Sequence, residues 1–232
     1  TRPLATLAKR FSIRTRKDNL SARVRRTLVS TLYTQPGSLA IGAFNGIAST
    51  AIAAWVSGYQ ILYVGCIILT VIAVARIVAS LGLSPHESNT STRKLELIYE
   101  IGAFSYAFAL GGIAALTIAL QAPASVEVLM IANATCYGVG ICARNAGRPT
   151  IAMGQLFLVC LPIMAAALYI GSLAFIALFV NMFLLIPAMA SITMNVFKVL
   201  RDSIAAADTS ARMADKMQIL ARTDVVTGLA NR

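Results

Sequence analysis

Charged residues are scarce in this chain of 232 amino acids. Only 12% of the residues are Asp, Glu, Lys or Arg, whereas 58% are hydrophobic. An ordinary soluble domain carries about 25% charged residues. This shortage excludes a soluble globular domain of the usual kind, and it directs attention to the long apolar segments that account for the composition.

Histidine and cysteine are too few to suggest metal or redox chemistry. The one histidine, His86, lies in a polar segment and cannot supply the paired axial ligands of a haem. The cysteines all fall in apolar segments, at spacings that match neither a disulfide framework nor a zinc site. We therefore predict no metal or redox centre, and we expect these cysteines to be small packing residues: Cys66, Cys136, Cys142 and Cys160.

Long apolar runs dominate the rest of the chain. A helix of about 20 residues, rising 1.5 Å per residue, spans a hydrocarbon core of roughly 30 Å. A surface helix of a soluble protein would instead show a polar stripe. The sequence therefore predicts an all-α bundle of six transmembrane helices within residues 35–197, with runs near 38–58, 59–81, 97–120, 125–143, 150–170 and 172–197.

Lysine and arginine are missing from three of the predicted loops, near Gly58, 121–125 and 171–172. These loops are also too short to form an external ligand-binding domain, so a stimulus would act within the bilayer, at its faces or through a partner. Nine of the 20 basic residues precede Thr27, and the others flank the remaining loops or follow the sixth run. The positive-inside rule then predicts that both termini are cytoplasmic. Because the basic residues that give the net charge of +11 then lie on the cytoplasmic side, they indicate contact with an anionic inner leaflet rather than with nucleic acid.

The basic N-terminal segment, residues 1–34, contains a stretch with helical periodicity. Between residues 18 and 33, Leu20, Val24, Leu28 and Leu32 recur at helical spacing among several arginines. This pattern predicts an amphipathic helix that lies on the inner leaflet. The alternative is a basic flank of the membrane domain that is helical without any further role.

Small residues recur at every fourth position in the first and third runs. Such spacing allows membrane helices to approach closely, because apolar side chains gain nothing by leaving lipid for one another. The packing lies either within one chain or across a dimer. The residues expected at these contacts are Gly42, Gly46, Ala103, Ala107 and Gly111.

Polar residues inside membrane spans are candidates for function because they are costly there. Arg76 and Glu100 lie at similar depths, so we predict an intramembrane ion pair. In the alternative, Arg76 extends to the inner headgroups and Glu100 lies at the interface. Four uncharged residues are expected to form hydrogen bonds between helices: Asn45, Asn133, Gln155 and Asn181.

The sixth run continues into an amphipathic segment, residues 198–222. Its apolar residues recur at alternating steps of three and four, as in a heptad repeat. We predict a parallel, dimeric, signalling coiled coil, in which a second stripe around Met213 and Met217 offers a competing register that a modest free-energy bias would select. An ordinary amphipathic connector is the alternative. The predicted seam is Phe197, Leu200, Ile204, Ala207, Ala211 and Ala214.

The stretch that follows, residues 224–232, carries a recognisable motif. It resembles the motif Asp-x-Leu-Thr-Gly-Leu-x-Asn-Arg that opens the catalytic domain of the GGDEF family of diguanylate cyclases. Val226 stands where Leu is usual, and a plain helix end followed by a turn is the alternative interpretation. We call this stretch the start motif; its matching residues are Asp224, Thr227, Gly228, Leu229, Asn231 and Arg232.

The resemblance implies that residues 223–232 begin a GGDEF domain whose catalytic part follows Arg232. The complete protein would then be a homodimeric enzyme of the bacterial inner membrane that condenses two GTP molecules, with Mg²⁺, into cyclic di-GMP. This chain itself shows no catalytic, cofactor-binding or metal-binding residues, so it would be the membrane sensor or anchor. Two alternatives stay open: a small six-helix transporter or channel, and the anchor of a class III nucleotide cyclase or a histidine kinase.

Overall fold

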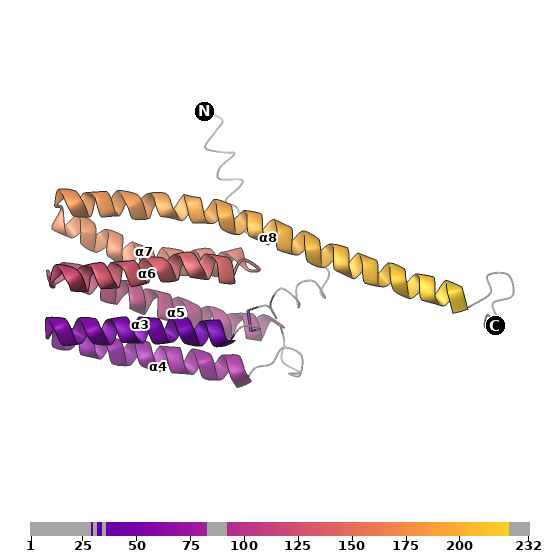
Figure 1. Cartoon of the computed structure of the whole chain (residues 1–232), viewed down its shortest axis with the longest axis horizontal. Helices are drawn as coiled ribbons and strands as arrows, with labels where there is room; N and C mark the ends of the chain where they lie inside the picture. Colours follow the sequence, from indigo (N-terminus) through magenta and orange to yellow (C-terminus); the bar gives the residue numbers. More distant parts are fainter. Residues whose placement is uncertain (1–28, 30–31, 34–35, 83–91, 223–232) are drawn as a thin grey trace, which may run out of the picture.

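A computed structural model describes residues 29, 32–33, 36–82 and 92–222 of the chain (Figure 1). These residues form an all-α bundle, and its six long helices are each long and apolar enough to cross a membrane. The six predicted spans are thereby confirmed. The helices are α3 (Pro36–Ser57), α4 (Gln60–Gly82), α5 (Thr92–Ala119), α6 (Ala124–Arg144), α7 (Pro149–Ile170) and α8 (Leu173–Arg222).

Local sequence explains where several of these helices begin and end. The φ angles of Gly58 and Gly171 are positive, at 69° and 68°. Glycine adopts such angles without steric cost, which allows the tight turns after α3 and α7. Pro36 and Pro149 occupy the first positions of α3 and α7, where a missing N–H costs nothing. Helix α5 begins five residues before the apolar run that starts at 97, because polar residues continue the helix beyond the apolar part.

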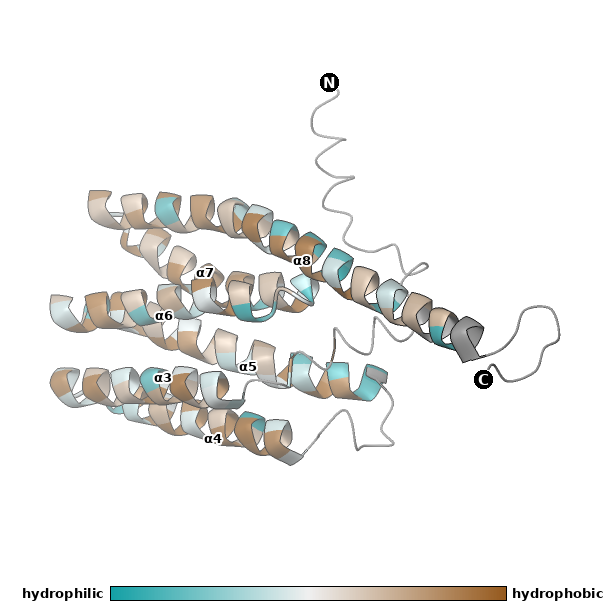
Figure 2. Cartoon of the chain, turned by 45° about the vertical axis from the view of Figure 1, so that its right-hand side comes forward, coloured by the Kyte–Doolittle hydropathy of each residue, from teal (hydrophilic) through white to brown (hydrophobic). Residues whose placement is uncertain are grey.

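The helices lie side by side, with α8 at one edge of the bundle and α3 and α4 at the other (Figure 1). Large apolar side chains point outward: Trp55 is 80% exposed and Leu173 is 84% exposed. Figure 2 shows hydrophobic residues along the length of the bundle, whereas hydrophilic residues gather at the start of α5 and in the distal part of α8. This distribution suits a lipid environment, and the chain is a multi-pass membrane bundle.

Small residues bring α5 and α7 into close contact. A Cβ atom added to Gly111 would lie 2.7 Å from the Cα atom of Val159, which is an overlap with backbone. Ala103 and Ala107 are fully buried on the same helix, and Gly46 of α3 lies directly against the ring of Tyr106. Gly42 differs from the other predicted packing residues, because a Cβ atom there would meet nothing within 4 Å.

One end of the bundle gathers the basic residues, and we call it the basic end. Here α4 and α6 end and α3, α5 and α7 begin. Five basic residues of the described loops and helix ends lie at or near it: Arg76, Arg93, Lys94, Arg144 and Arg148.

Three residues before α3 pack into the bundle at the basic end. Val29 and Leu32 are 1% exposed, and Tyr33 donates a 2.7 Å hydrogen bond to the carbonyl oxygen of Leu95. Most of the predicted interfacial helix, residues 18–33, lies outside the described residues. For Leu32 the prediction of a leaflet contact is wrong, because its side chain belongs to a buried apolar cluster with residues of α5 and α7.

Helix α8 is a single helix of 50 residues. At a rise of about 1.5 Å per residue, its length is about 75 Å. Its first part runs beside α7, and the remainder extends past the basic end (Figure 1). The predicted linker, residues 198–222, is therefore helical. Ala207, Ala211 and Ala214 of the predicted seam are exposed on the single chain. The start motif lies outside the described residues.

Candidate functional site

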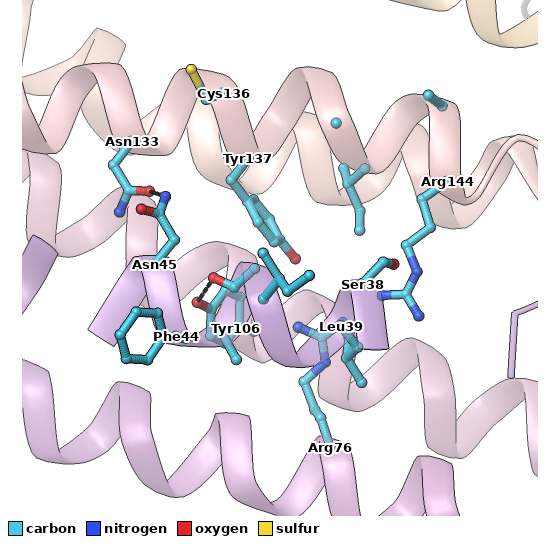
Figure 3. Close-up of a pocket in the computed structure, with 16 residues that line it drawn as sticks. Ser38, Leu39, Phe44, Asn45, Arg76, Tyr106, Asn133, Cys136, Tyr137 and Arg144 are labelled. Atoms are coloured by element: carbon cyan, nitrogen blue, oxygen red, sulfur yellow. Dashed lines mark hydrogen bonds between the residues drawn. The ribbon is translucent and has the colours of Figure 1, made fainter. Parts of the chain in front are cut away.

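The half of the bundle near the basic end contains a pocket of about 790 Å³. It is lined by residues of α3, α4, α5 and α6 (Figure 3). Seven of these residues carry the polar side chains of the site: Ser38, Asn45, Arg76, Tyr106, Asn133, Tyr137 and Arg144.

Arg76 enters the pocket from α4. Its guanidinium carbon lies 5.0 Å from the centroid of the Tyr106 ring, within the range of a cation–π interaction. Its Nη2 atom is buried and has no hydrogen-bond partner among the described residues. Figure 3 shows the side chain pointing into the pocket.

In the described part of the chain, Arg76 contacts Tyr106 and forms no ion pair with Glu100, so the predicted pair is replaced by a ring contact. Gly102 leaves room for the aliphatic stem of Arg76 to lie along α5. Tyr106 is four residues further on and therefore on the same face of α5, whereas Glu100 is two residues before Gly102 and on another face. Glu96 of α5 is instead paired with Arg148, the residue that precedes α7.

Two contacts connect α3 across the pocket to α5 and α6. Asn45 donates a hydrogen bond of 2.7 Å from Nδ2 to Oδ1 of Asn133, as expected for interhelical partners. The hydroxyl of Tyr106 donates a 3.3 Å hydrogen bond to the carbonyl oxygen of Gly42. Figure 3 shows both bonds, which hold α3 beside helices that are distant in sequence.

A buried hydrogen-bond network extends from the pocket towards the basic end. Gln155, which is fully buried, donates to the hydroxyl of Tyr137 at 2.8 Å and to the carbonyl oxygen of Ala103 at 3.3 Å. Asn145 donates to Oε1 of Gln155 at 2.6 Å and accepts from the hydroxyl of Tyr99 at 2.9 Å. The network is thus continuous over three helices and the α6–α7 connection.

Aromatic contacts extend this network at both of its ends. The rings of Tyr137 and Tyr106 lie 5.2 Å apart in the pocket. At the basic end, the ring of Tyr99 meets that of Tyr33 edge-on at 5.6 Å. Burial and the neighbouring Tyr99 raise the pKa of Tyr33 to about 12, so its hydroxyl remains protonated and keeps its hydrogen bond. The pocket is therefore connected to the segment that precedes α3.

Sequence reasoning found part of this site. It selected Arg76, Asn45, Asn133 and Gln155, whereas it assigned no role to the tyrosines or to Asn145. Tyr99 and Tyr106 are seven residues apart, a spacing that puts them on one face of a helix and was available as a signal. Asn145 follows the end of α6 and looked like an ordinary loop residue.

The remaining predicted polar and sulfur-containing residues lie in different places. Asn181 is exposed on α8, and no hydrogen bond of its side chain is seen in the described part of the chain. Cys142 and Cys160 are buried packing residues, as expected, whereas Cys136 is exposed at the rim of the pocket. Among the described residues there is no group of three or more His, Cys, Asp or Glu side chains that would hold a metal ion.

No protein-family model, no curated protein and no solved structure matches this chain.

Proposed function

We propose that this chain is the membrane-embedded sensor or anchor of a diguanylate cyclase, and that it controls dimerisation of the catalytic domain. The observation that carries the proposal is the continuity of α8, which runs as one helix from the membrane bundle to Arg222. The start motif follows within two residues. A continuous helix of this kind would carry a signal from the membrane bundle to a catalytic domain that follows the start motif.

The proposed output is the condensation of two GTP molecules, with Mg²⁺, into cyclic di-GMP. In the family that the start motif resembles, each catalytic domain holds one GTP, so two domains must meet face to face. The seam from Phe197 to Ala214 would pair α8 with its copy in a homodimer. A change in the bundle that favours one register of this pair would bring the domains together or hold them apart.

The activity of the complete protein tests the proposal. Ala206 is exposed on α8 and does not belong to the seam. Ala206→Pro would interrupt the helix at a cost of about 3 kcal/mol. We expect cyclic di-GMP production to change severalfold, whereas Ala206→Ser should leave it close to the wild-type value. The absence of any cyclase activity in the complete protein would reject the proposal.

Dimerisation is tested separately by cross-linking. In a background where the four native cysteines are replaced by alanine, Ile204→Cys and Ala207→Cys should each join like chains under mild oxidation. Cysteines on the opposite face of α8, at Ala205 or Thr209, provide the matched control. Failure to cross-link at every position of the seam would contradict the parallel coiled coil.

The resemblance of the start motif supports a bacterial inner membrane, and the charge distribution supports both termini in the cytoplasm. Reporters fused after Gly58 and Gly171 should then respond as external sites. A cytoplasmic response at either position would reverse the proposed topology.

Transport is the second candidate function, because Asn45 and Asn133 line the pocket in the way that a polar pathway would require. The opposite half of the same helices is tightly packed, with Ala53, Ala54 and Met130 fully buried. A pathway through the bundle would need these residues to separate. Uptake of a small solute by proteoliposomes that contain this chain would favour transport over signalling.

A further inference from the structure

The pocket carries two positive charges, and none of the described residues that line it is acidic. Arg76 reaches it from α4 and Arg144 from the end of α6 (Figure 3). An arginine inside the apolar part of a membrane protein is costly unless an acceptor or a counter-charge meets it. Arg76 meets the ring face of Tyr106, but its buried Nη2 atom has no hydrogen-bond partner in the part of the chain that the structure describes.

The other pocket walls are mostly apolar and open towards lipid. Leu39, Ala43 and Ile141 line the interior. At the rim, Ile41 and Phe44 of α3 are 72% and 75% exposed on the outer surface of the bundle. The volume of the pocket is about 790 Å³. Small-molecule sites in proteins have volumes of roughly 300–1,000 Å³, so this pocket is large enough for a ligand.

We propose that this pocket binds an anionic amphiphile, with its carboxylate or phosphate head between Arg76 and Arg144. Arginine suits this role because its planar guanidinium group donates two parallel hydrogen bonds to either head group. The apolar tail lies along α3 past Ile41 and Phe44 and leaves the bundle between α3 and α6. Two sources share this chemistry: a phospholipid of the surrounding leaflet and a fatty acid. The proposal concerns binding alone and does not depend on the identity of the output enzyme.

Two kinds of variant separate binding in the pocket from general attraction to the membrane surface. Arg76→Gln and Arg144→Gln remove one charge each, and Arg93→Gln is the control because Arg93 is an exposed cation near the same end. Gly140→Leu adds a side chain at the wall of the pocket, and its Cβ atom would meet nothing within 4 Å among the described residues. Gly112→Leu is its matched control, because Gly112 has the same open space and does not line the pocket.

Native mass spectrometry of the whole chain, released from nanodiscs, measures the ligand that stays bound. The nanodiscs contain phosphatidylcholine alone, or phosphatidylcholine with either phosphatidylglycerol or oleate added. We expect one anionic molecule to be retained, and Arg76→Gln, Arg144→Gln and Gly140→Leu each to lower its retention by about tenfold. Arg93→Gln and Gly112→Leu should behave like the wild type.

Retention of phosphatidylglycerol would identify a phospholipid as the occupant, and retention of oleate alone would identify a fatty acid; both results support the site. Retention of neither anion would overturn the proposal. Equal losses in Arg93→Gln or Gly112→Leu would overturn it as well, because binding would then not depend on the pocket. Thermal unfolding of each variant checks that the chain is folded, and Gly140→Leu should be at least as stable as the wild type because leucine favours the helix over glycine.

Discussion

The contact between α5 and α7 at Gly111 allows a sharp test of how this bundle is held together. In Gly111→Ala the new Cβ atom would lie 2.7 Å from the Cα atom of Val159, whereas ordinary van der Waals contacts lie at 3.4–4 Å. The two helices would have to separate by about 1 Å, and a gap of that size forfeits a quarter to a half of the dispersion energy of each contact.

The expected cost follows from two opposing terms. Forcing an extra methyl group into a packed interior typically costs about 1–3 kcal/mol. Alanine is a better helix former than glycine by about 0.8–1 kcal/mol, which offsets part of that cost. We therefore expect Gly111→Ala to lower the free energy of unfolding by up to about 2 kcal/mol, which raises the unfolded fraction by up to roughly 30-fold.

The neighbouring residue supplies the control. A Cβ atom on Gly112 would meet nothing within 4 Å. Gly112→Ala should therefore leave stability unchanged or raise it by up to about 1 kcal/mol. Titration with SDS in mixed micelles, followed by circular dichroism, gives the free energy of unfolding of both variants. If Gly111→Ala is as stable as Gly112→Ala, the close approach of α5 and α7 does not exist as described.

Three further predictions concern the polar groups. Gln155→Leu should cost about 1–3 kcal/mol in the same titration, because it leaves buried hydrogen-bond partners unpaired, whereas the exposed Asn181→Leu should cost nothing measurable. Tyr33 has a folded-state pKa of about 12 against 10.0 when unperturbed, so the stability that it provides is complete below pH 10 and is lost between pH 10 and 12. The wild type should show a phenolate absorbance step near pH 12 that is missing from Tyr33→Phe. If the step that Tyr33→Phe removes lies near pH 10 instead, the burial of Tyr33 is contradicted. Arg76→Glu should damage the bundle, and adding Glu100→Arg should not rescue it; rescue would mean that the two side chains do meet.

The transmembrane helices were predictable from the sequence because each one forms on the strength of its own residues alone. About twenty apolar residues form a helix in lipid whatever their neighbours, so the runs between Pro36 and Phe197 indicated the helices directly. The need of Asn45, Asn133 and Gln155 for hydrogen-bond partners was equally local. A buried amide in a membrane helix has to find a partner on another helix.

The pocket was not predictable, because it depends on which helices become neighbours. Asn45 and Asn133 are 88 residues apart, and nothing in the spacing of either span shows that α3 and α6 lie side by side. The partner of Arg76 failed as a prediction for a related reason. Arg76 and Glu100 lie at similar depths in the membrane, and the prediction paired them for that reason. Arg76 instead contacts the face of α5 that carries Gly102 and Tyr106. The depth of a residue in the membrane follows from the sequence of its own span, whereas the residue that it contacts depends on how two helices pack together.

Pro187 gives α8 a mechanical property that follows from its position within the helix. A proline there removes one backbone hydrogen bond and crowds the carbonyl group of Phe183, so bending is easiest at this level. About 35 residues of α8 lie between Pro187 and Arg222, which makes an arm of about 52 Å. A tilt of about one degree at the proline would sweep the far end of such an arm through about 1 Å. Small rearrangements among the other helices would therefore arrive at the far end of α8 as sideways displacements of about 1–2 Å, the size of the helix shifts that accompany switching in other proteins.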